Sequence, residues 1–232
     1  MSETTSIDLI IPVFNPPVGW AEKTKTSLLD FQSQLGQTVN LIIVDDGSKN
    51  QAELEQLQTL VPSIRIERLQ KNRGKGSALR HGFKLSNSDV ALFTDADFPY
   101  EVSSMKDIAQ AIDRGADVAL GYREQDYYAS VPWFRKGLSE AFRFILKSIL
   151  KFPVTDTQCG LKGMSSDGRQ VFLKTNIDRF MVDMEFIKIA TRNPALKVVP
   201  VVVKLRPNVE FSSMGPMVLM REVLNFLKVL LS

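Results

Sequence analysis

Short apolar runs that alternate with helical segments constrain the fold of this chain most strongly. The runs are rich in Ile, Leu and Val, whereas the segments between them repeat apolar residues every three or four positions. We expect strands over 7–14, 39–48, 64–69, 89–97 and 116–123. We expect helices over 20–36, 51–60, 74–86 and 101–114, the first of them capped by Gly36. This alternation predicts an α/β fold with a mostly parallel sheet that helices cover on both faces.

The second half of the sequence is less regular. A strong helical stripe covers 135–152, and the remaining expected elements are a short strand near 160–164, helices near 166–174 and 183–192, a strand over 196–205 and an apolar helix over 216–231. We therefore expect one domain over 1–213 and an additional C-terminal helix over 214–232.

Composition excludes several classes of protein. The chain has 232 residues, 44% of them hydrophobic and 24% charged, which suits a globular domain. A net charge of +3 argues against a nucleic-acid binder. The one cysteine, Cys159, excludes an internal disulfide and suits a reducing compartment. The N-terminus does not resemble a signal peptide and no apolar run could span a membrane, so we expect a cytoplasmic protein, peripheral at the cytoplasmic membrane face.

Acidic residues follow two of the expected strands. Asp45 and Asp46 end one strand, and Asp95 and Asp97 end another, where open α/β sheets bind ligands. Each could be an ordinary turn aspartate. In an extended segment, however, Asp95 and Asp97 would point the same way, and two carboxylates that close repel unless a cation lies between them. The pattern suits a nucleotide together with Mg²⁺ or Mn²⁺.

The stretch "NRGKGSALRHGF" (72–83) combines glycines with basic residues at a helix start. Such a start could bind a phosphate, but the spacing matches neither a Walker loop nor a convincing dinucleotide fingerprint. Glycines that allow close helix packing are the plainer interpretation. His81 is the only histidine, and we expect it to have a structural role rather than a catalytic one. The sequence contains no His/Cys spacing typical of zinc ligands.

Taken together, these motifs resemble a known family. "IIPVFNP", "LIIVDDGS", "NRGKGSALRHGF", "LFTDADF" and "DTQCGLKGM" occur in the order seen in family 2 glycosyltransferases, over about residues 7–205. "DTQCG" and "FMVDMEF" are most similar to the dolichyl- and polyprenyl-phosphate glucosyl- and mannosyltransferases. The resemblance implies the A-type glycosyltransferase fold, a nucleotide-sugar donor, Mg²⁺ or Mn²⁺, and inversion at the sugar carbon.

The resemblance also implies roles for individual residues. The implied donor-binding residues are Pro12, Asn15, Asp45, Asp46, Lys75, Asp95 and Ala96. The implied metal ligands are Asp95 and Asp97. The implied acceptor-binding residues are Arg123, Arg135, Ser139, Gln158 and Glu185. The implied catalytic residues are Asp97, Asp183, Arg123 and Arg135.

Two departures from the family pattern refine the expectation. Mannosyl-transferring members often carry a glutamine after D-A-D-x, whereas Phe98 and Pro99 follow here, which favours UDP-glucose over GDP-mannose. The C-terminal membrane spans usual in polyprenyl-type members do not follow the domain in this sequence.

Several alternatives remain open from the sequence. A polyprenyl phosphate is already an anionic nucleophile and needs cations such as Arg123 and Arg135. A saccharide hydroxyl, as in cell-surface glycan synthesis, would need a base, for which Asp183 is the best candidate. A sugar nucleotidyltransferase would carry a Gly-rich basic signature where "PVFNPPVG" stands, and a receiver-like module would be about half this length.

The C-terminal segment 215–232 predicts a helix whose apolar residues cover most of its circumference. Arg221, Glu222, Asn225 and Lys228 share the remaining narrow strip. Lys136, Arg143, Lys147 and Lys151 make one face of the 135–152 helix basic. We therefore expect peripheral membrane association. A helix that caps the core or forms an oligomer contact is the alternative.

Overall fold

The computed structural model describes residues 5–123, 152–154, 156–207, 209 and 216–231. Within these residues, seven strands form one sheet in the order β3-β2-β1-β4-β6-β5-β7. The strands are β1 (Ile7–Val13), β2 (Asn40–Asp45), β3 (Arg65–Arg68), β4 (Val90–Phe93), β5 (Val118–Tyr122), β6 (Lys162–Met164) and β7 (Val198–Val202). Only β6 runs antiparallel to its neighbours, β4 and β5, so the predicted mostly parallel sheet is confirmed.

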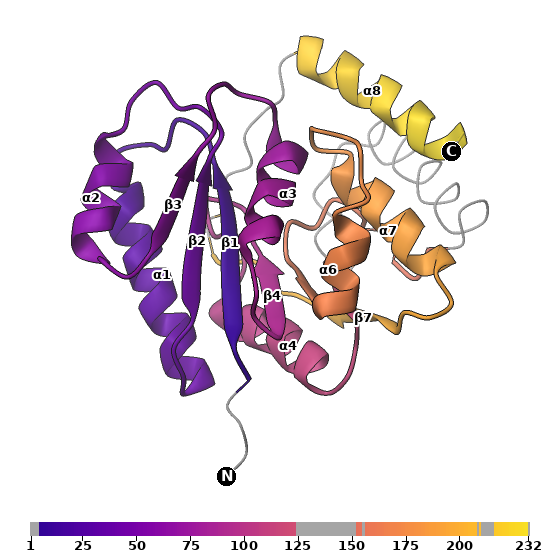
Figure 1. Cartoon of the computed structure of the whole chain (residues 1–232), viewed down its shortest axis with the longest axis horizontal. Coiled ribbons are helices and arrows are strands. Elements are labelled where there is room, and N and C mark those ends of the chain that lie inside the picture. The colour runs from indigo at the N-terminus through magenta and orange to yellow at the C-terminus, as the bar shows by residue number, and fades with distance from the viewer. Residues whose placement is uncertain (1–4, 124–151, 155, 208, 210–215, 232) are drawn as a thin grey trace.

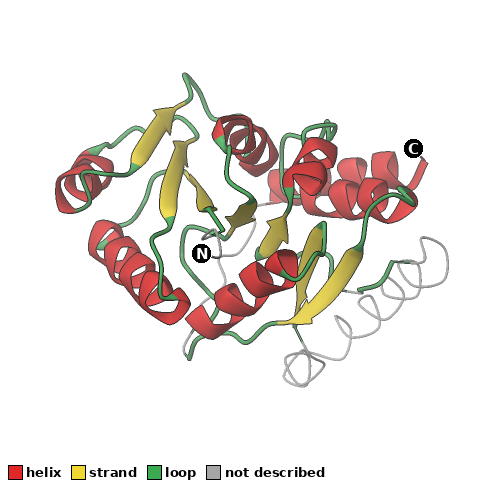
Figure 2. Cartoon of the chain, turned by 60° about the horizontal axis from the view of Figure 1, so that its bottom comes forward, coloured by secondary structure: helices red, strands yellow, loops and turns green. Residues whose placement is uncertain are grey.

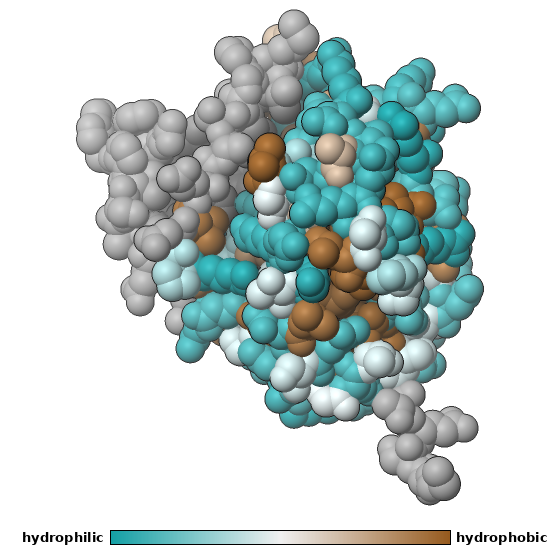
Figure 3. Space-filling view, turned by 90° about the vertical axis from the view of Figure 1, so that its left-hand side faces the viewer, coloured by the Kyte–Doolittle hydropathy of each residue, from teal (hydrophilic) through white to brown (hydrophobic). Residues whose placement is uncertain are grey.

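Helices cover both faces of this sheet (Figures 1 and 2). On one face lie α1 (Trp20–Leu35), α2 (Ala52–Leu60) and α4 (Val102–Asp113). On the other lie α3 (Lys75–Leu85), α6 (Ser166–Phe172) and α7 (Val182–Arg192), with α8 (Pro216–Leu231) packed on α7. The side that α1 and α2 cover is mostly hydrophilic, with an apolar patch near its centre (Figure 3).

Burial on both faces explains why the strands read as continuous apolar runs. Along β1, Leu9 and Ile11 enter the core beneath α1, whereas Ile10 enters the core beneath α3. Successive side chains of a strand point to opposite faces, so a sheet covered twice needs apolar residues at every position. The predicted cap of α1 is also confirmed: Gly36 has φ +71° and its N–H donates to the Gln32 carbonyl at 2.9 Å.

The predicted strands all extend beyond the observed strands, and at β4 the difference changes the geometry of the acidic pair. The expected strand 89–97 ends at Phe93 in β4, so Asp95 and Asp97 do not belong to an extended segment. Instead the Phe98 N–H donates to the Asp95 carbonyl at 3.0 Å and closes a turn. Phe98 has φ +47° and is buried, and its burial holds this turn in place. The expected helix 135–152 lies outside the described residues.

The glycines of α3 allow it to pack closely on the sheet. A Cβ atom on Gly82 would lie 2.5 Å from Ile10 Cγ2 in β1 and 3.2 Å from Val44 Cγ2 in β2. A Cβ atom on Gly76 would lie 2.2 Å from the Ile177 carbonyl oxygen. The close-packing interpretation therefore accounts for both of these glycines.

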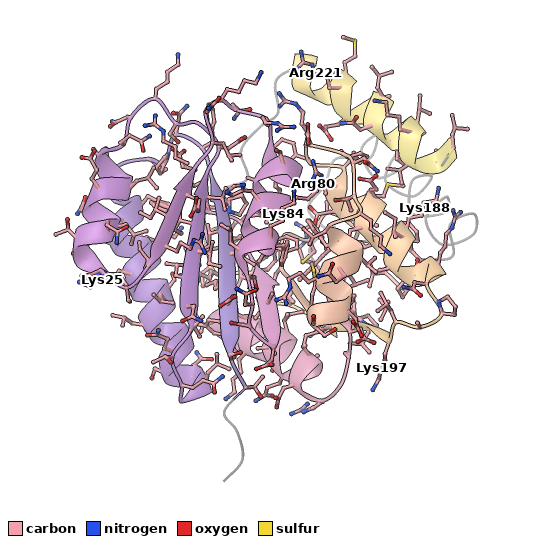
Figure 4. The ribbon with its side chains drawn as sticks, in the orientation of Figure 1. Lys25, Arg80, Lys84, Lys188, Lys197 and Arg221 are labelled. Carbon is pink, nitrogen blue, oxygen red and sulfur yellow. The ribbon has the colours of Figure 1, made fainter. Side chains whose placement is uncertain are left out.

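We expect Gly82→Ala to destabilise the protein. Overpacking costs about 1–3 kcal/mol, which exceeds the gain of about 1 kcal/mol that alanine has over glycine in a helix. The free energy of unfolding from urea titration should therefore fall, by about 1 kcal/mol. Lys84→Ala, at an exposed position of the same helix (Figure 4), should change it by less than about 0.5 kcal/mol. A Gly82→Ala protein more stable than the parent would show that α3 is not packed this tightly.

Candidate functional site

The acidic turn at the end of β4 forms the centre of the candidate site. It lies at the carboxyl edge of the sheet, toward which β1, β2 and β3 also point (Figure 1). Two residues of α1 hold its backbone: Trp20 Nε1 donates to the Ala96 carbonyl at 2.8 Å, and the Lys23 ammonium donates to the Asp97 carbonyl. These contacts leave the Asp97 side chain exposed and the Asp95 side chain half-exposed, as ligand-binding carboxylates require.

A buried row of alternating charges lies behind Asp95. Lys75 Nζ lies 2.8 Å from Asp95 Oδ1 and 3.1 Å from Asp183 Oδ2. The other oxygen of Asp183 lies 2.7 Å from Nζ of Lys162, whose side chain is 0% exposed. Lys162 also donates to the Cys159 carbonyl. The ammonium groups of both lysines lie over the ring of Phe93, at 5.4 and 5.5 Å from its centroid, where a ring face attracts cations.

These contacts keep the two central groups of the row charged. Burial lowers the pKa of Lys75, but Asp183 and Asp95 together outweigh it, so that pKa lies above its usual value. Burial likewise raises the pKa of Asp183, but Lys162 and Lys75 outweigh it and bring that pKa below its usual value. A carboxylate held between two ammonium groups is a weak proton acceptor, so this geometry disfavours Asp183 as a general base.

The loop "DTQCG" forms the floor beneath Asp95. A Cβ atom on Gly160 would lie 1.7 Å from Asp95 Oδ2, so a larger residue here would displace this carboxylate. The Gly160 N–H donates to the Tyr100 hydroxyl at 2.8 Å, which fixes the loop against the segment that follows the acidic turn. Gln158 contacts the sulfur of Met181 at 3.7 Å. Binding of the acceptor by Gln158 remains a prediction.

Asp45 and Asp46 bind neighbouring backbone rather than each other. Asp45 accepts the Ser48 N–H at 2.9 Å and pairs with Arg68 at 3.4 Å, which makes it a turn aspartate. Asp46 accepts the N–H groups of Arg73 and Gly74 at 2.9 and 2.7 Å and so fixes the start of α3 beside β2. Burial raises the pKa of Asp46 despite these two hydrogen bonds. The donor-binding roles of both residues remain predictions.

The loops after β1 and β2 are joined at the same edge of the sheet. Asn15, with φ +50°, donates its N–H to the Ser48 hydroxyl at 2.7 Å and accepts the Lys49 N–H at 2.9 Å. Pro12 lies in β1 beside Val44 of β2. Both predicted donor residues therefore lie next to the Asp45–Asp46 segment.

The other predicted acceptor residues fall into three places. Arg123 makes a two-pronged ion pair with Asp156, with its Nε and Nη2 atoms both 2.7 Å from carboxylate oxygens, and the pair raises the pKa of Arg123 although burial lowers it. Glu185 accepts the N–H groups of Asn176 and Ile177 and holds the loop before α7. Arg135 and Ser139 lie outside the described residues. Binding of an acceptor by these four residues remains a prediction.

Sequence reasoning missed Lys162 and Asp156. Lys162 stands in the short, otherwise apolar stretch "GLKGM", where a buried lysine needs a carboxylate partner. That was a usable signal, although the partner Asp183 lies 21 residues further along the chain. Asp156 gives no such signal, because a loop aspartate is ordinary.

Asp95 and Asp97 offer the oxygen ligands that Mg²⁺ and Mn²⁺ prefer. Partial desolvation within the turn and the neighbouring Asp95 both raise the pKa of Asp97. Within the described residues, no group of three or more His, Cys, Asp or Glu side chains could enclose a metal by itself. The pair therefore fits an ion such as Mg²⁺, which takes one or two carboxylates and completes its shell with substrate phosphates and water.

The fold belongs to the A-type glycosyltransferase class, as predicted. Mannosyl-3-phosphoglycerate synthase from Rubrobacter xylanophilus superposes with a TM-score of 0.69 at 11% identity, over 97% of this chain and 73% of that chain. Glucosyl-3-phosphoglycerate synthase from Mycobacterium tuberculosis superposes with a TM-score of 0.63 at 16% identity, over 97% and 78%. At these identities the likeness concerns the fold alone.

Sequence comparison then identifies the family. Residues 8–170 match the family described as Glycosyl transferase family 2, and the chain belongs to this family. It is 26% identical to human dolichyl-phosphate beta-glucosyltransferase over 207 residues, which cover 82% of this chain and 64% of that protein. It is 28% identical to undecaprenyl-phosphate 4-deoxy-4-formamido-L-arabinose transferase from Edwardsiella ictaluri over 163 residues, covering 69% and 49%. The chain thus spans less than two thirds of either relative.

We expect Gly160→Ala and Gly163→Ala to separate site geometry from stability. At position 160 the new methyl group must push the half-exposed Asp95 away from Lys75, so binding of UDP with Mn²⁺ should weaken about tenfold or more while the melting temperature changes little. At position 163 the methyl group meets Ile108 Cγ2 at 2.6 Å in the core, so the melting temperature should fall while binding persists. Isothermal titration and thermal melts measure both. Equal losses of binding in the two variants would contradict the role assigned to Gly160.

Proposed function

We propose that this chain is an inverting glycosyltransferase that moves a hexose from a nucleotide-diphosphate sugar to a polyprenyl phosphate such as dolichyl or undecaprenyl phosphate. The observation that carries the proposal is the acidic turn at the end of β4, packed against Lys75 and Gly160, in a family 2 domain. The similarity to transferases named for dolichyl and undecaprenyl phosphates supports the acceptor class.

The donor is a nucleotide sugar that binds at the carboxyl edge of β1, β2 and β4. Asn15, Asp45 and Asp46 line the side for the base and ribose, and Asp95 and Asp97 hold Mg²⁺ or Mn²⁺. A bound divalent ion stabilises the negative charge of a departing diphosphate. Glucosyl-3-phosphoglycerate synthase, which has a similar fold, was crystallised with UDP and either Mn²⁺ or Mg²⁺, and this supports the assignment. Similarity to glucosyltransferases favours UDP-glucose.

The acceptor is an anion that needs positioning and no general base. One of its phosphate oxygens attacks the anomeric carbon opposite the nucleotide, the bond to the nucleotide diphosphate breaks, and the diphosphate leaves with the bonding electrons. Arg123, Arg135 and Ser139 are the residues proposed to position it. The alternative acceptor, a saccharide hydroxyl, would depend on Asp183, which two lysines already neutralise.

We propose that α8 brings the domain to an anionic membrane surface. The helix is oriented with a charged residue inward: Glu222 is buried and accepts the Met181 N–H at 2.9 Å. Its exposed face is apolar, with exposed fractions of 46–87% at Met220, Val223, Leu224, Leu227 and Leu231, the last three of which line a groove beside the loop before α7. Apolar packing in the domain core therefore does not account for the predicted wide apolar stripe.

Basic residues flank this apolar face. Arg221 and Lys228 are exposed on α8, and with Arg73 and Arg179 they line a groove of about 770 Å³ between α8 and the loop before α7 (Figure 4 labels Arg221). Two acids of the groove, Asp178 and Glu185, are already paired with Arg80 and with backbone N–H groups. None of the helices in the described ranges has the length and apolar character of a membrane span. An apolar face bordered by cations suits binding in the plane of an anionic interface.

We expect Asp97→Ala to lower the turnover number by about 10²–10³-fold, because removal of one electrostatic stabiliser from a transition state typically costs that much. Transfer of labelled glucose from UDP-glucose to dolichyl phosphate measures it, and excess EDTA should abolish transfer by the parent protein. Asp107→Asn, at an exposed position of α4, is the control and should keep full activity. Undiminished transfer in EDTA would refute the metal role. A neutral alkyl glycoside that outperforms dolichyl phosphate would refute the acceptor class.

We expect Leu224→Asp to abolish membrane association, because it places a charge in the apolar face of α8. The full chain should float with vesicles of phosphatidylcholine and phosphatidylglycerol at low salt, and the variant should partition about tenfold less or worse. Leu29→Asp on α1 is a matched control, since Leu29 is 52% exposed and Leu224 is 56% exposed. If Leu224→Asp floats like the parent but loses a dimer in sedimentation, α8 is an oligomer contact instead.

A further inference from the structure

The Lys75 ammonium already occupies a cation position in the acidic turn. It lies 2.8 Å from Asp95 Oδ1, an oxygen that a divalent ion would also need. The Lys75 side chain is only 10% exposed, and the Asp95 side chain is 35% exposed on the open side of the site. Within the described part of the chain, Lys75 is the one residue that forms an ion pair with either carboxylate of the turn.

A second carboxylate keeps Lys75 in an ion pair when a metal binds Asp95. Asp183 Oδ2 lies 3.1 Å from the same ammonium, on the buried side. Asp183 is itself fixed, because its Oδ1 atom is paired with the fully buried Lys162 at 2.7 Å. Lysine bears a compact charge on a flexible stem, so it can exchange partners without a change in the backbone.

We propose that Lys75 competes with the divalent ion for Asp95 and that the buried Asp183–Lys162 pair positions it for the exchange. Without donor, the ammonium neutralises Asp95. When a divalent ion takes Asp95 and Asp97, Lys75 keeps Asp183 as its partner and remains beside the site as a cation. The inference rests on the metal site of the proposed function and adds roles for Lys75, Asp183 and Lys162 that the acidic turn alone does not imply.

Counting charges supports this exchange. Asp95, Asp97 and Asp183 face the ammonium groups of Lys75 and Lys162, and the Lys23 ammonium lies at the Asp97 carbonyl, so the charges of the donor-free cluster balance. A divalent ion adds two positive charges. The loaded cluster then attracts a diphosphate more strongly than the empty cluster does. Ordered binding, with the metal before or together with the nucleotide, follows from these charges.

The test measures Mn²⁺ binding in the absence of any nucleotide. The electron paramagnetic resonance signal of free Mn²⁺ reports how much of the ion is bound. Lys75→Met replaces the competing charge by a neutral side chain of similar length. We expect this variant to bind Mn²⁺ about tenfold more tightly than the parent, because an opposite charge this close alters proton binding to a carboxylate by about tenfold or more. Lys84→Met removes the same charge from an exposed position of the same helix and should leave Mn²⁺ affinity within about twofold. Equal affinity in parent and Lys75→Met, or no Mn²⁺ binding by Lys75→Met, would overturn the inference.

A double-mutant cycle tests the positioning role of Asp183. We expect the Asp183→Asn variant to bind Mn²⁺ more weakly than the parent does, because Lys75 is then left with Asp95 as its only carboxylate partner in the cluster. In the Lys75→Met background the same change should have a smaller effect. Equal effects in both backgrounds would show that Asp183 acts as a distant charge and would overturn its positioning role. Thermal melts verify that the Asp183→Asn proteins fold.

A failure of the competition between Lys75 and the metal can be distinguished from a failure of the proposed function. If the parent binds UDP with Mn²⁺ and transfers glucose, but Lys75→Met binds Mn²⁺ no better without nucleotide, only the competition is wrong. If UDP binds and glucose is transferred equally well in EDTA, the metal part of the proposed function is wrong, whatever the Mn²⁺ affinities of the variants.

Discussion

The Asp183 carboxylate, held between Lys75 and Lys162, is the interaction on which the candidate site depends. It joins α7 to the start of α3 and to β6, and each of these segments comes from a different motif of the sequence. Burying charged groups is costly unless each is paired, and removing one partner leaves the others uncompensated. Because the row continues through Lys75 to Asp95, the geometry of the exposed acidic turn depends on a pair that solvent barely reaches.

The sheet topology explains how distant motifs come together at this row. β6 enters antiparallel between β4 and β5, so the loop "DTQCG" that precedes it reaches the carboxyl ends of its parallel neighbours. Gly160 then lies under Asp95, and Lys162, two residues later, points to Asp183. A parallel strand at this position would have placed its preceding loop at the opposite edge of the sheet. Among the described strands, β6 is the reversed one, and its direction brings Gly160 and Lys162 to the site.

The sequence predicted the alternation of strands and helices well, because burial on both faces of the sheet leaves a strong apolar signal. It predicted less well where a strand stops: the strand expected over 89–97 ends at Phe93, since the turn at Phe98 depends on contacts with α1 that no local pattern encodes. Asp95, Asp97 and Asp183 were found, as were Lys75 and Arg123, but Lys162, Asp156 and the pairing of these charges were not. Asp183 and Lys162 meet only after folding, and Arg123 and Asp156 pair over 33 residues.

The partners of the carboxylates bear on the chemistry of the acceptor. Among the described residues of the site, Asp45 and Asp46 bind backbone N–H groups, Asp156 binds Arg123, and Asp183 binds two lysines. Asp95 and Asp97 remain, and a metal that holds a diphosphate would draw on both. No carboxylate of this set is then left to deprotonate a sugar hydroxyl, which has a very high pKa and needs a base. A phosphate acceptor is ionised before it arrives, so a site whose acids are all committed to positioning favours an anionic nucleophile.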